Sequence, residues 1–194
     1  MQPIQPNESI CPVCGRSAFD GKTHPICRTK YTPEGLISFF RYSGVVKKAV
    51  KELKYRYVSD LAGDFASLFP LNQLIKVTDS SFTIVPIPLH PERLRFRGFN
   101  QSEVLSGIIS EKLHIPVRTD LLARLKKTAA QAELHKRKER LKNMVHVFGS
   151  TQGVNGFRII LVDDVYTTGA TMLEATKVLK QAGAKSVLAV TIAR

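Results

Sequence analysis

Two adjacent carboxylates and a turn rich in hydroxyl groups set apart the segment IILVDDVYTTGAT, residues 159–171. An apolar run ends at Asp163 and Asp164, and residues 167–171 then supply three threonine hydroxyls around Gly169. Such a turn can surround a phosphate with backbone N–H groups and hydroxyls, because glycine lets a ligand approach the backbone closely. The carboxylates would repel that phosphate, so we expect them to face a neutral diol, such as a ribose, or a metal ion. The segment predicts a sugar-phosphate site; the alternative is a polar helix cap without a ligand.

A second group of phosphate-binding candidates lies in PIPLHPERLRFRGFNQ, residues 86–101. Two prolines rigidify the turn at its start, and Arg93, Arg95 and Arg97 alternate, so that an extended chain would direct all three to one side. Arginine binds phosphate oxygens through a planar pair of donors. We expect this segment to bind a diphosphate; a solvated basic loop is the alternative.

All three cysteines of the chain lie near its start, in the pattern Cys11-Pro-Val-Cys14 followed by His24-Pro-Ile-Cys27. Two pairs, each with two intervening residues, can place three thiolates and one imidazole around a tetrahedral Zn²⁺ ion. A closed site with four protein ligands leaves no open position for catalysis, so the expected role of this zinc is folding or partner binding. Thiols without a metal are the alternative.

The chain has 194 residues, a formal net charge of +13 and a hydrophobic content of 43%. That content suits one compact domain with a buried core and room for a small appendage. The charge favours anionic partners such as phosphorylated metabolites, nucleic acid or a membrane surface, without choosing among them. No apolar run approaches the roughly 20 residues that span a bilayer, and the first residues do not resemble a signal peptide. We expect a cytoplasmic protein without membrane insertion, in a compartment that keeps thiols reduced.

The pattern of apolar residues predicts strands that alternate with helices along most of the chain. Expected strands cover residues 36–42, 82–88, 115–117, 121–124, 145–148, 158–162 and 186–192, and expected helices cover residues 45–53, 61–69, 100–113, 131–143 and 171–182. Asn100 followed by Glu103 is typical of a helix start. The alternation predicts an α/β protein with a parallel sheet covered on both faces. Ligands of such sheets bind beyond the carboxyl ends of the strands, where Asp163 and Asp164 are expected.

The segment VDDVYTTGAT closely resembles the 5-phosphoribosyl-1-pyrophosphate (PRPP) motif of type I phosphoribosyltransferases. Four further segments resemble the ComF/ComFC family of competence-associated proteins: FFRYSGVVKKAVKELKY, VPIPLHPERLRFRGFNQSEVLS, RLKKTAAQAELHKRKERLKNMVHVF and the terminal TIAR. Together they cover nearly the whole chain. The resemblance implies a type I phosphoribosyltransferase-like parallel sheet with flanking helices, plus a small N-terminal zinc-binding module. The expected domains are residues 1–33 and residues 34–194.

The resemblance also implies a role for each part of the site. Asp163 and Asp164 would bind the ribose hydroxyls, and the 5-phosphate would be bound by Tyr166, Thr167, Thr168, Gly169, Ala170 and Thr171. Pyrophosphate with Mg²⁺ would lie by Ile87, Pro88 and Leu89, near Arg97 of the RGFNQ signature. A loop that closes over pyrophosphate in such enzymes would add Arg124, Lys126 and Lys127. The family has cysteine where His24 stands, which leaves the fourth zinc ligand open.

Two functions from different classes fit this sequence. The first is transfer of 5-phosphoribosyl to an acceptor that the sequence does not identify. The second is a binding protein of DNA uptake and natural transformation, as the ComF resemblance implies, with a vestigial or regulatory PRPP site. Single-stranded DNA or a DNA-uptake helicase would then be its partner, contacted by the basic surface together with the zinc module. Residues 136–142 are the basic stretch best placed for a nucleic-acid backbone, with a solvated helix face as the alternative. Aromatic residues between the basic ones, Phe96 with Phe99 and Tyr55 with Tyr57, could stack on bases, although we expect them in the core. The oligomeric state is not predicted.

Overall fold

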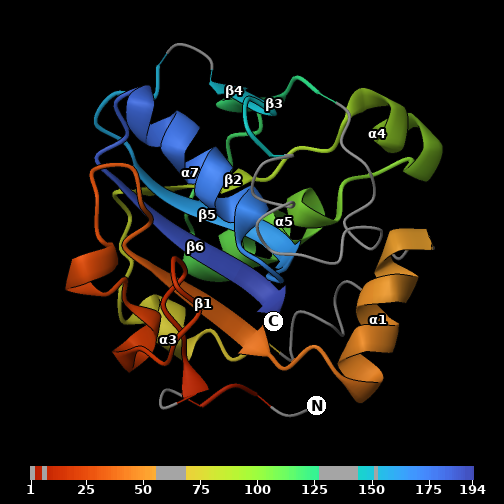
Figure 1. Ribbon diagram of the computed structural model, residues 1–194. Coiled ribbons are helices and arrows are strands. Elements are labelled where there is room, and N and C mark those ends of the chain that lie inside the picture. Colours follow the sequence, from red (N-terminus) through yellow and green to blue (C-terminus); the bar gives the residue numbers. More distant parts are fainter. Residues whose placement is uncertain (1–2, 6–7, 56–68, 127–143, 151–152) are drawn as a thin grey trace.

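A computed structural model of the protein describes residues 3–5, 8–55, 69–126, 144–150 and 153–194 (Figure 1). Four parallel strands form the central sheet in the order β1-β6-β5-β2: β1 (Gly35–Phe40), β6 (Ser186–Ala193), β5 (Arg158–Val165) and β2 (Phe82–Pro86). Two short antiparallel strands, β3 (Leu122–Arg124) and β4 (Phe148–Ser150), form a second sheet. The α-helices are α1 (Gly44–Tyr55), α3 (Asn72–Ile75), α4 (Pro91–Arg97), α5 (Gln101–Leu113) and α7 (Ala170–Gln181), and two short 3-10 helices are η2 (Phe19–Gly21) and η3 (Pro25–Cys27).

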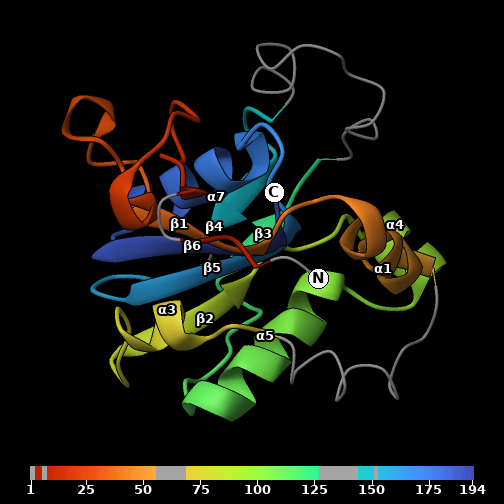
Figure 2. The same cartoon turned by 90° about the horizontal axis from the view of Figure 1, so that it is seen from below.

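Both faces of the central sheet are covered, as predicted. Figure 2 shows α7 and the small β3–β4 sheet on one side of it and α3 and α5 on the other. Strand β5 contributes side chains to the core on both faces of the sheet. Ile159 and Leu161 belong to the core on the α7 side, and Ile160 and Val162 belong to the core on the α5 side. A parallel strand buried on both faces needs a continuous apolar run rather than an alternating one, and residues 159–162 are such a run.

The start of α5 follows the predicted cap. The side chain of Asn100 accepts a hydrogen bond from the N–H of Ser102 at 3.1 Å and donates to the Glu103 carboxylate at 3.1 Å. Its amide also donates to the carbonyl oxygen of Ile87 at 3.0 Å. One buried side chain therefore begins the helix and fixes the loop after β2, because its bonds to the Ser102 N–H and the Ile87 carbonyl oxygen satisfy backbone groups of both segments.

The expectation that Arg93, Arg95 and Arg97 lie on an extended chain is wrong, because these residues form helix α4. His90 accepts the N–H of Glu92 at the start, a proline occupies the first turn, and Gly98 ends the helix with φ of +78°. Proline at the start and glycine at the end are helix signals that outweigh the alternation of charges. On a helix, Arg93 and Arg97 are four residues apart and share a face, whereas Arg95 lies on another.

Smaller differences concern strand ends and short elements. The strand expected at residues 145–148 begins at Phe148, because residues 144–146 form a turn in which His146 has φ of +57°. The strand expected at residues 115–117 is reduced to one bridge between Ile84 and Val117. Helix α3 was not expected.

Several predictions lie outside the described residues. They are the helix at residues 131–143, most of the helix at residues 61–69, Lys127, the basic residues 136–142, Tyr57 and the side chain of Tyr55. Within the part of the chain that the structure describes, no helix is long and apolar enough to cross a membrane.

Candidate functional site

The two carboxylates, Asp163 and Asp164, lie among the last three residues of β5, at its carboxyl end. Asp163 Oδ1 accepts hydrogen bonds from the Ser102 hydroxyl at 3.1 Å and from the Asp164 N–H at 2.9 Å. Asp164 Oδ1 accepts the N–H of Val165 at 2.7 Å. Both side chains are half-buried. These contacts hold the carboxylates in fixed orientations at the edge of the sheet where ligands of parallel sheets bind.

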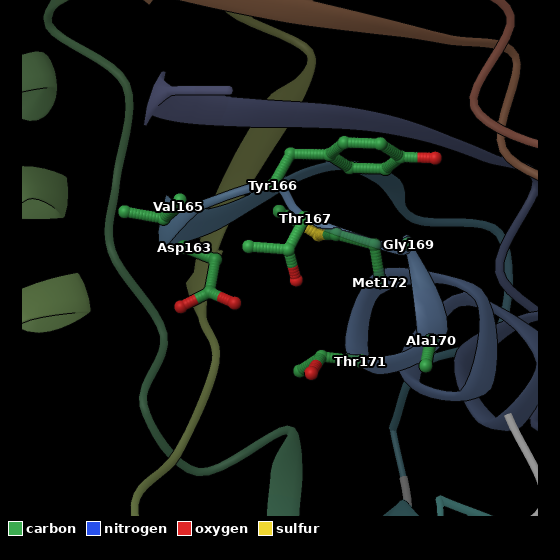
Figure 3. Close-up of a pocket in the computed structure, with 8 residues that line it drawn as sticks. All are labelled: Asp163, Val165, Tyr166, Thr167, Gly169, Ala170, Thr171 and Met172. Carbon is green, nitrogen blue, oxygen red and sulfur yellow. The ribbon is translucent and has the colours of Figure 1, made fainter. Parts of the chain in front are cut away.

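The turn after β5 and the first turn of α7 form a pocket with Asp163 (Figure 3). Figure 3 shows the Asp163 carboxylate and the hydroxyls of Thr167 and Thr171 on the same side of the loop. Gly169 is the N-cap of α7 with φ of +80°, and the side chain of Thr168 accepts the Ala170 N–H at 3.5 Å. The first N–H groups of a helix have no acceptor within the helix, and the helix dipole favours an anion there. The arrangement suits a phosphate beside a hydroxylated group.

The Tyr166 side chain is turned away from this open side. It is only 5% exposed, and its hydroxyl donates to the Pro12 carbonyl oxygen at 2.8 Å. Its backbone N–H donates to the Ala193 carbonyl oxygen at 2.8 Å. A contact between Tyr166 and PRPP stays a prediction, while the observed contacts connect this residue to the N-terminal segment and to β6.

The loop after β2 lies beside the carboxylates because β2 and β5 are neighbours in the sheet. The Ile87 N–H donates to the Val162 carbonyl oxygen at 2.8 Å, which continues the pairing past the end of β2. Ile87 is buried, and Pro88 and Leu89 are half-buried. The structure therefore brings together the two segments that the sequence separates by more than 70 residues, as expected for a site with two phosphate-binding parts.

Arg124, the last residue of β3, lies near the Asp163 carboxylate. Burial and the nearby Arg93 lower the pKa of Arg124 from its usual value, and the nearby Asp163 acts in the opposite direction. The Arg124 guanidinium also lies 5.5 Å from the centre of the Phe148 ring. Arg97, at the end of α4, donates to Gln101 Oε1 at 3.2 Å.

Arg124 was predicted as a candidate clamp, but no pattern in the sequence indicates its approach to Asp163. Ser102 was not predicted as part of the site, and no sequence signal marks it beyond its place directly after RGFNQ. Lys126 is exposed, and Lys127 lies outside the described residues.

The four predicted metal ligands meet at one place. One ligand atom from each of Cys11, Cys14, His24 and Cys27 lies within 4.8 Å of the others, close enough to hold a metal ion. A tetrahedral Zn²⁺ site with Zn–S distances of about 2.3 Å has edges of about 3.8 Å, so the cluster fits zinc. His24 Nε2 lies 2.9 Å from the Ser17 carbonyl oxygen, and Nδ1 lies 3.4 Å from Cys14 Sγ. Because Nε2 must carry the proton to donate to that carbonyl, Nδ1 offers its lone pair to the cluster, as is usual for a metal-bound histidine.

The thiols of the cluster differ in acidity. Burial raises the pKa of Cys11, but backbone N–H groups of Cys14, His24 and Val13 outweigh it and bring that pKa down to about 7. Partial desolvation and the neighbouring Cys14 and Cys11 thiols raise the pKa of Cys27 to about 11. The backbone is therefore arranged to stabilise a thiolate at Cys11, which is the form that binds a metal.

Part of the chain matches a known domain family. Residues 100–194, which include α5, β5, the turn after it and α7, match the phosphoribosyl transferase domain family model. A solved structure of adenine phosphoribosyltransferase from Leishmania donovani aligns over 79% of this chain and 70% of its own, with 16% identity and a TM-score of 0.40. The family match and the parallel sheet define a type I phosphoribosyltransferase-like domain.

Two relatives match almost the whole chain, and a third matches more than half of it. Competence protein ComFC of Bacillus subtilis is 32% identical over 95% of this chain and 78% of its own length. The DNA utilization protein YhgH of Salmonella typhimurium is 30% identical over 95% of this chain and 83% of its own. Competence protein F of Haemophilus influenzae is 37% identical over 57% of this chain and 49% of its own. The chain therefore belongs to the ComF/ComFC family.

Proposed function

We propose that this protein binds PRPP with Mg²⁺ and takes part in DNA uptake and natural transformation. The observation that carries the PRPP assignment is the convergence of two carboxylates, a helix N-terminus and the loop after β2 at one edge of the sheet. The role in DNA uptake is supported by relatives named as competence and DNA utilization proteins. The protein acts in the cytoplasm, where the Cys11, Cys14 and Cys27 thiols stay reduced.

Each half of PRPP has a matching part of the site. The ribose hydroxyls donate to Asp163 and Asp164, and the 5-phosphate is bound by residues 166–171 at the start of α7. Pyrophosphate lies by residues 87–89, with Arg97, Lys126 and Lys127 supplying positive charge. Asp163 and Asp164 are the carboxylates that could hold Mg²⁺ here, and the ion would supply positive charge that stabilises the leaving pyrophosphate.

The transfer reaction that this site supports is displacement at C1 of the ribose. A nucleophile of the acceptor forms a bond to C1 while the bond from C1 to the pyrophosphate oxygen breaks, and pyrophosphate leaves with the electron pair. Asp163 and Asp164 orient the ribose and compensate the positive charge that develops on it. Arg97 and the lysines of the loop after β3 stabilise the departing pyrophosphate.

The N-terminal cluster holds a structural Zn²⁺ ion. Cys11, Cys14, His24 and Cys27 fill all four tetrahedral positions, so the ion would stabilise the fold rather than catalyse transfer. We place the domain boundary after residue 33, directly before β1, with residues 1–33 as the zinc module and residues 34–194 as the phosphoribosyltransferase-like domain.

The PRPP assignment is tested by calorimetric titration of PRPP with Mg²⁺ into the zinc-loaded protein and its Asp164→Ala variant. Hydrogen bonds to a charged group contribute about 1.5–3 kcal/mol, so the variant is expected to bind at least about tenfold more weakly. Asp79→Ala is the matched control, because Asp79 pairs with Arg158 at the opposite edge of the sheet. Equal affinity of the two variants would contradict the assignment.

A second function, binding of single-stranded DNA, is favoured by one specific observation. Phe96 on α4 was expected in the core but is 83% exposed, and the exposed Arg95 precedes it. Leu94 on the same helix is 39% exposed. An exposed ring beside a cation suits stacking on a base with contact to the neighbouring phosphate.

Replacing Phe96 with alanine is expected to weaken single-strand binding, since stacking on one base contributes about 1–3 kcal/mol. Fluorescence anisotropy of a labelled oligonucleotide would then give an affinity at least about fivefold lower at a fixed salt concentration. Ile75→Ala is the control, because Ile75 is an apolar residue that is 54% exposed but lies on α3. A parent protein that binds the oligonucleotide no better than either variant would exclude this function for α4.

A further inference from the structure

The metal cluster and the phosphate-binding turn are in direct contact through one side chain. The Tyr166 hydroxyl donates to the carbonyl oxygen of Pro12, which lies between the ligands Cys11 and Cys14. Pro12 is buried, and the Tyr166 ring points away from Asp163 toward the N-terminal chain (Figure 3). Residues 154 positions apart in the sequence therefore share a buried hydrogen bond.

On the N-terminal side, the position of the Pro12 carbonyl depends on the cluster. The turn is held by hydrogen bonds from Cys11 N–H to the Arg16 carbonyl oxygen and from Gly15 N–H to the Cys11 carbonyl oxygen, both at 2.9 Å. A metal ion bound by Cys11 and Cys14 fixes both ends of the segment that carries this carbonyl. Without the ion, the hydrogen bonds of the turn remain, but a metal no longer fixes the two ligand residues at the ends of this segment.

On the other side, the Tyr166 ring determines the space at Gly169. A Cβ atom built on Gly169 would lie 2.4 Å from the Tyr166 hydroxyl oxygen and 2.9 Å from the ring carbon that carries it. Gly169 is the N-cap of α7, so its position sets where the first N–H groups of that helix point. The hydroxyl end of the Tyr166 ring therefore lies closely against the backbone that begins α7, and we expect a shift of the ring to change the position of that turn.

From these two contacts we propose that Tyr166 is a positioning residue that couples metal binding at the cluster to sugar-phosphate binding at the turn after β5. The proposal rests on the PRPP and zinc assignments above. Zinc bound to Cys11 and Cys14 fixes the position of the Pro12 carbonyl between them. That carbonyl accepts the hydrogen bond from the Tyr166 hydroxyl and so positions the ring, and the ring keeps the start of α7 in the form that binds phosphate. Coupling between two sites is reciprocal, so bound PRPP strengthens zinc binding by the same factor by which zinc strengthens PRPP binding.

The Tyr166→Phe variant tests the coupling, because it keeps the ring and removes only the hydroxyl. The first measurement is PRPP affinity with Mg²⁺ by calorimetry, for zinc-loaded parent and variant. The second is transfer of zinc from the loaded protein to a chromophoric chelator, with and without PRPP. In the parent we expect PRPP to strengthen zinc retention by about tenfold, the scale of one well-made buried hydrogen bond. In the variant this factor falls to about one, and PRPP affinity falls toward that of zinc-depleted parent.

Tyr31→Phe is the matched control, since Tyr31 follows the last metal ligand but lies outside the turn that carries Pro12. It is expected to behave as the parent. PRPP binding that is equal in parent and Tyr166→Phe, with zinc retention unchanged by PRPP in both, would overturn the coupling and leave the proposed function standing. Absence of PRPP binding by the zinc-loaded parent would overturn both. The chelator experiment starts from the folded, zinc-loaded protein. It therefore measures the effect of PRPP on zinc retention even if the chain unfolds once zinc is removed.

Discussion

Replacing Gly169 with alanine is expected to reduce PRPP affinity by about a hundredfold and to destabilise the fold. The residue has φ of +80°, a conformation that costs an alanine about 1–2 kcal/mol. The added methyl group would also meet the Tyr166 hydroxyl at 2.4 Å and push it from Pro12, which leaves a buried acceptor without its donor at a cost of about 1–3 kcal/mol. Together these terms are on the order of 3 kcal/mol. We expect the unbound variant to relieve them by shifting the turn, so restoring the turn for phosphate binding costs about the same amount, which is about a hundredfold in affinity.

Calorimetric titration with PRPP and thermal unfolding are the measurements for this variant. Gly107→Ala is the matched control: Gly107 lies in α5, has no atom within 4 Å of an added Cβ, and its replacement is expected to stabilise the helix by about 0.5–1 kcal/mol. A PRPP affinity of Gly169→Ala within about threefold of that of Gly107→Ala would show that the turn tolerates a side chain. That result would contradict the close packing of Gly169 against Tyr166.

Removing one thiol from the cluster should abolish stoichiometric zinc binding. At free zinc about 1,000 times its dissociation constant, the ion stabilises a folded protein by about 4 kcal/mol. For a chain of this length, the Cys11→Ser variant should therefore unfold about 8–16 °C lower than the zinc-loaded parent. Metal content by elemental analysis and unfolding by calorimetry measure the two effects.

Because all three cysteines belong to the cluster, its matched control comes from the histidines. His24→Asn removes the fourth ligand and should weaken zinc binding, whereas His114→Asn should retain one zinc per chain. His114 ends α5 with φ of +54°, a conformation that asparagine adopts readily. One zinc per chain in both Cys11→Ser and His24→Asn would place the metal elsewhere.

Local patterns in the sequence were enough for the framework of this fold. The buried run at residues 159–162, the cap at Asn100 and the alternation of strands and helices predicted the parallel sheet and its two covered faces. The spacing of the cysteines and His24 predicted the cluster, because metal ligands close in sequence need little long-range information. Side-chain contacts between distant segments could not be predicted in this way: Ser102 meets Asp163, and Tyr166 meets Pro12, only after the sheet has formed.

Helix α4 shows why two signals in one short segment can mislead. Alternating arginines suggested an extended chain, but the proline at its start and Gly98 at its end outweigh that alternation. Phe96 was expected in the core because aromatic residues usually are buried. A seven-residue helix at the edge of the domain has too little contact area to bury every apolar residue, and Phe96 remains exposed.

The strand order has a consequence for how a growing chain acquires this structure. Strand β1 aligns with β6, Gly35 beside Leu188, although β1 is the first strand to be synthesised and β6 the last. Within the described sheet, β1 has no strand partner other than β6. We therefore expect β1 to join the sheet only after almost all of the chain has been synthesised. The four proposed metal ligands, in contrast, lie within 17 consecutive residues, from Cys11 to Cys27, so zinc could bind them early in synthesis. We therefore expect the proposed zinc module to fold before the sheet is complete and to contact the turn after β5 only once that turn has been synthesised.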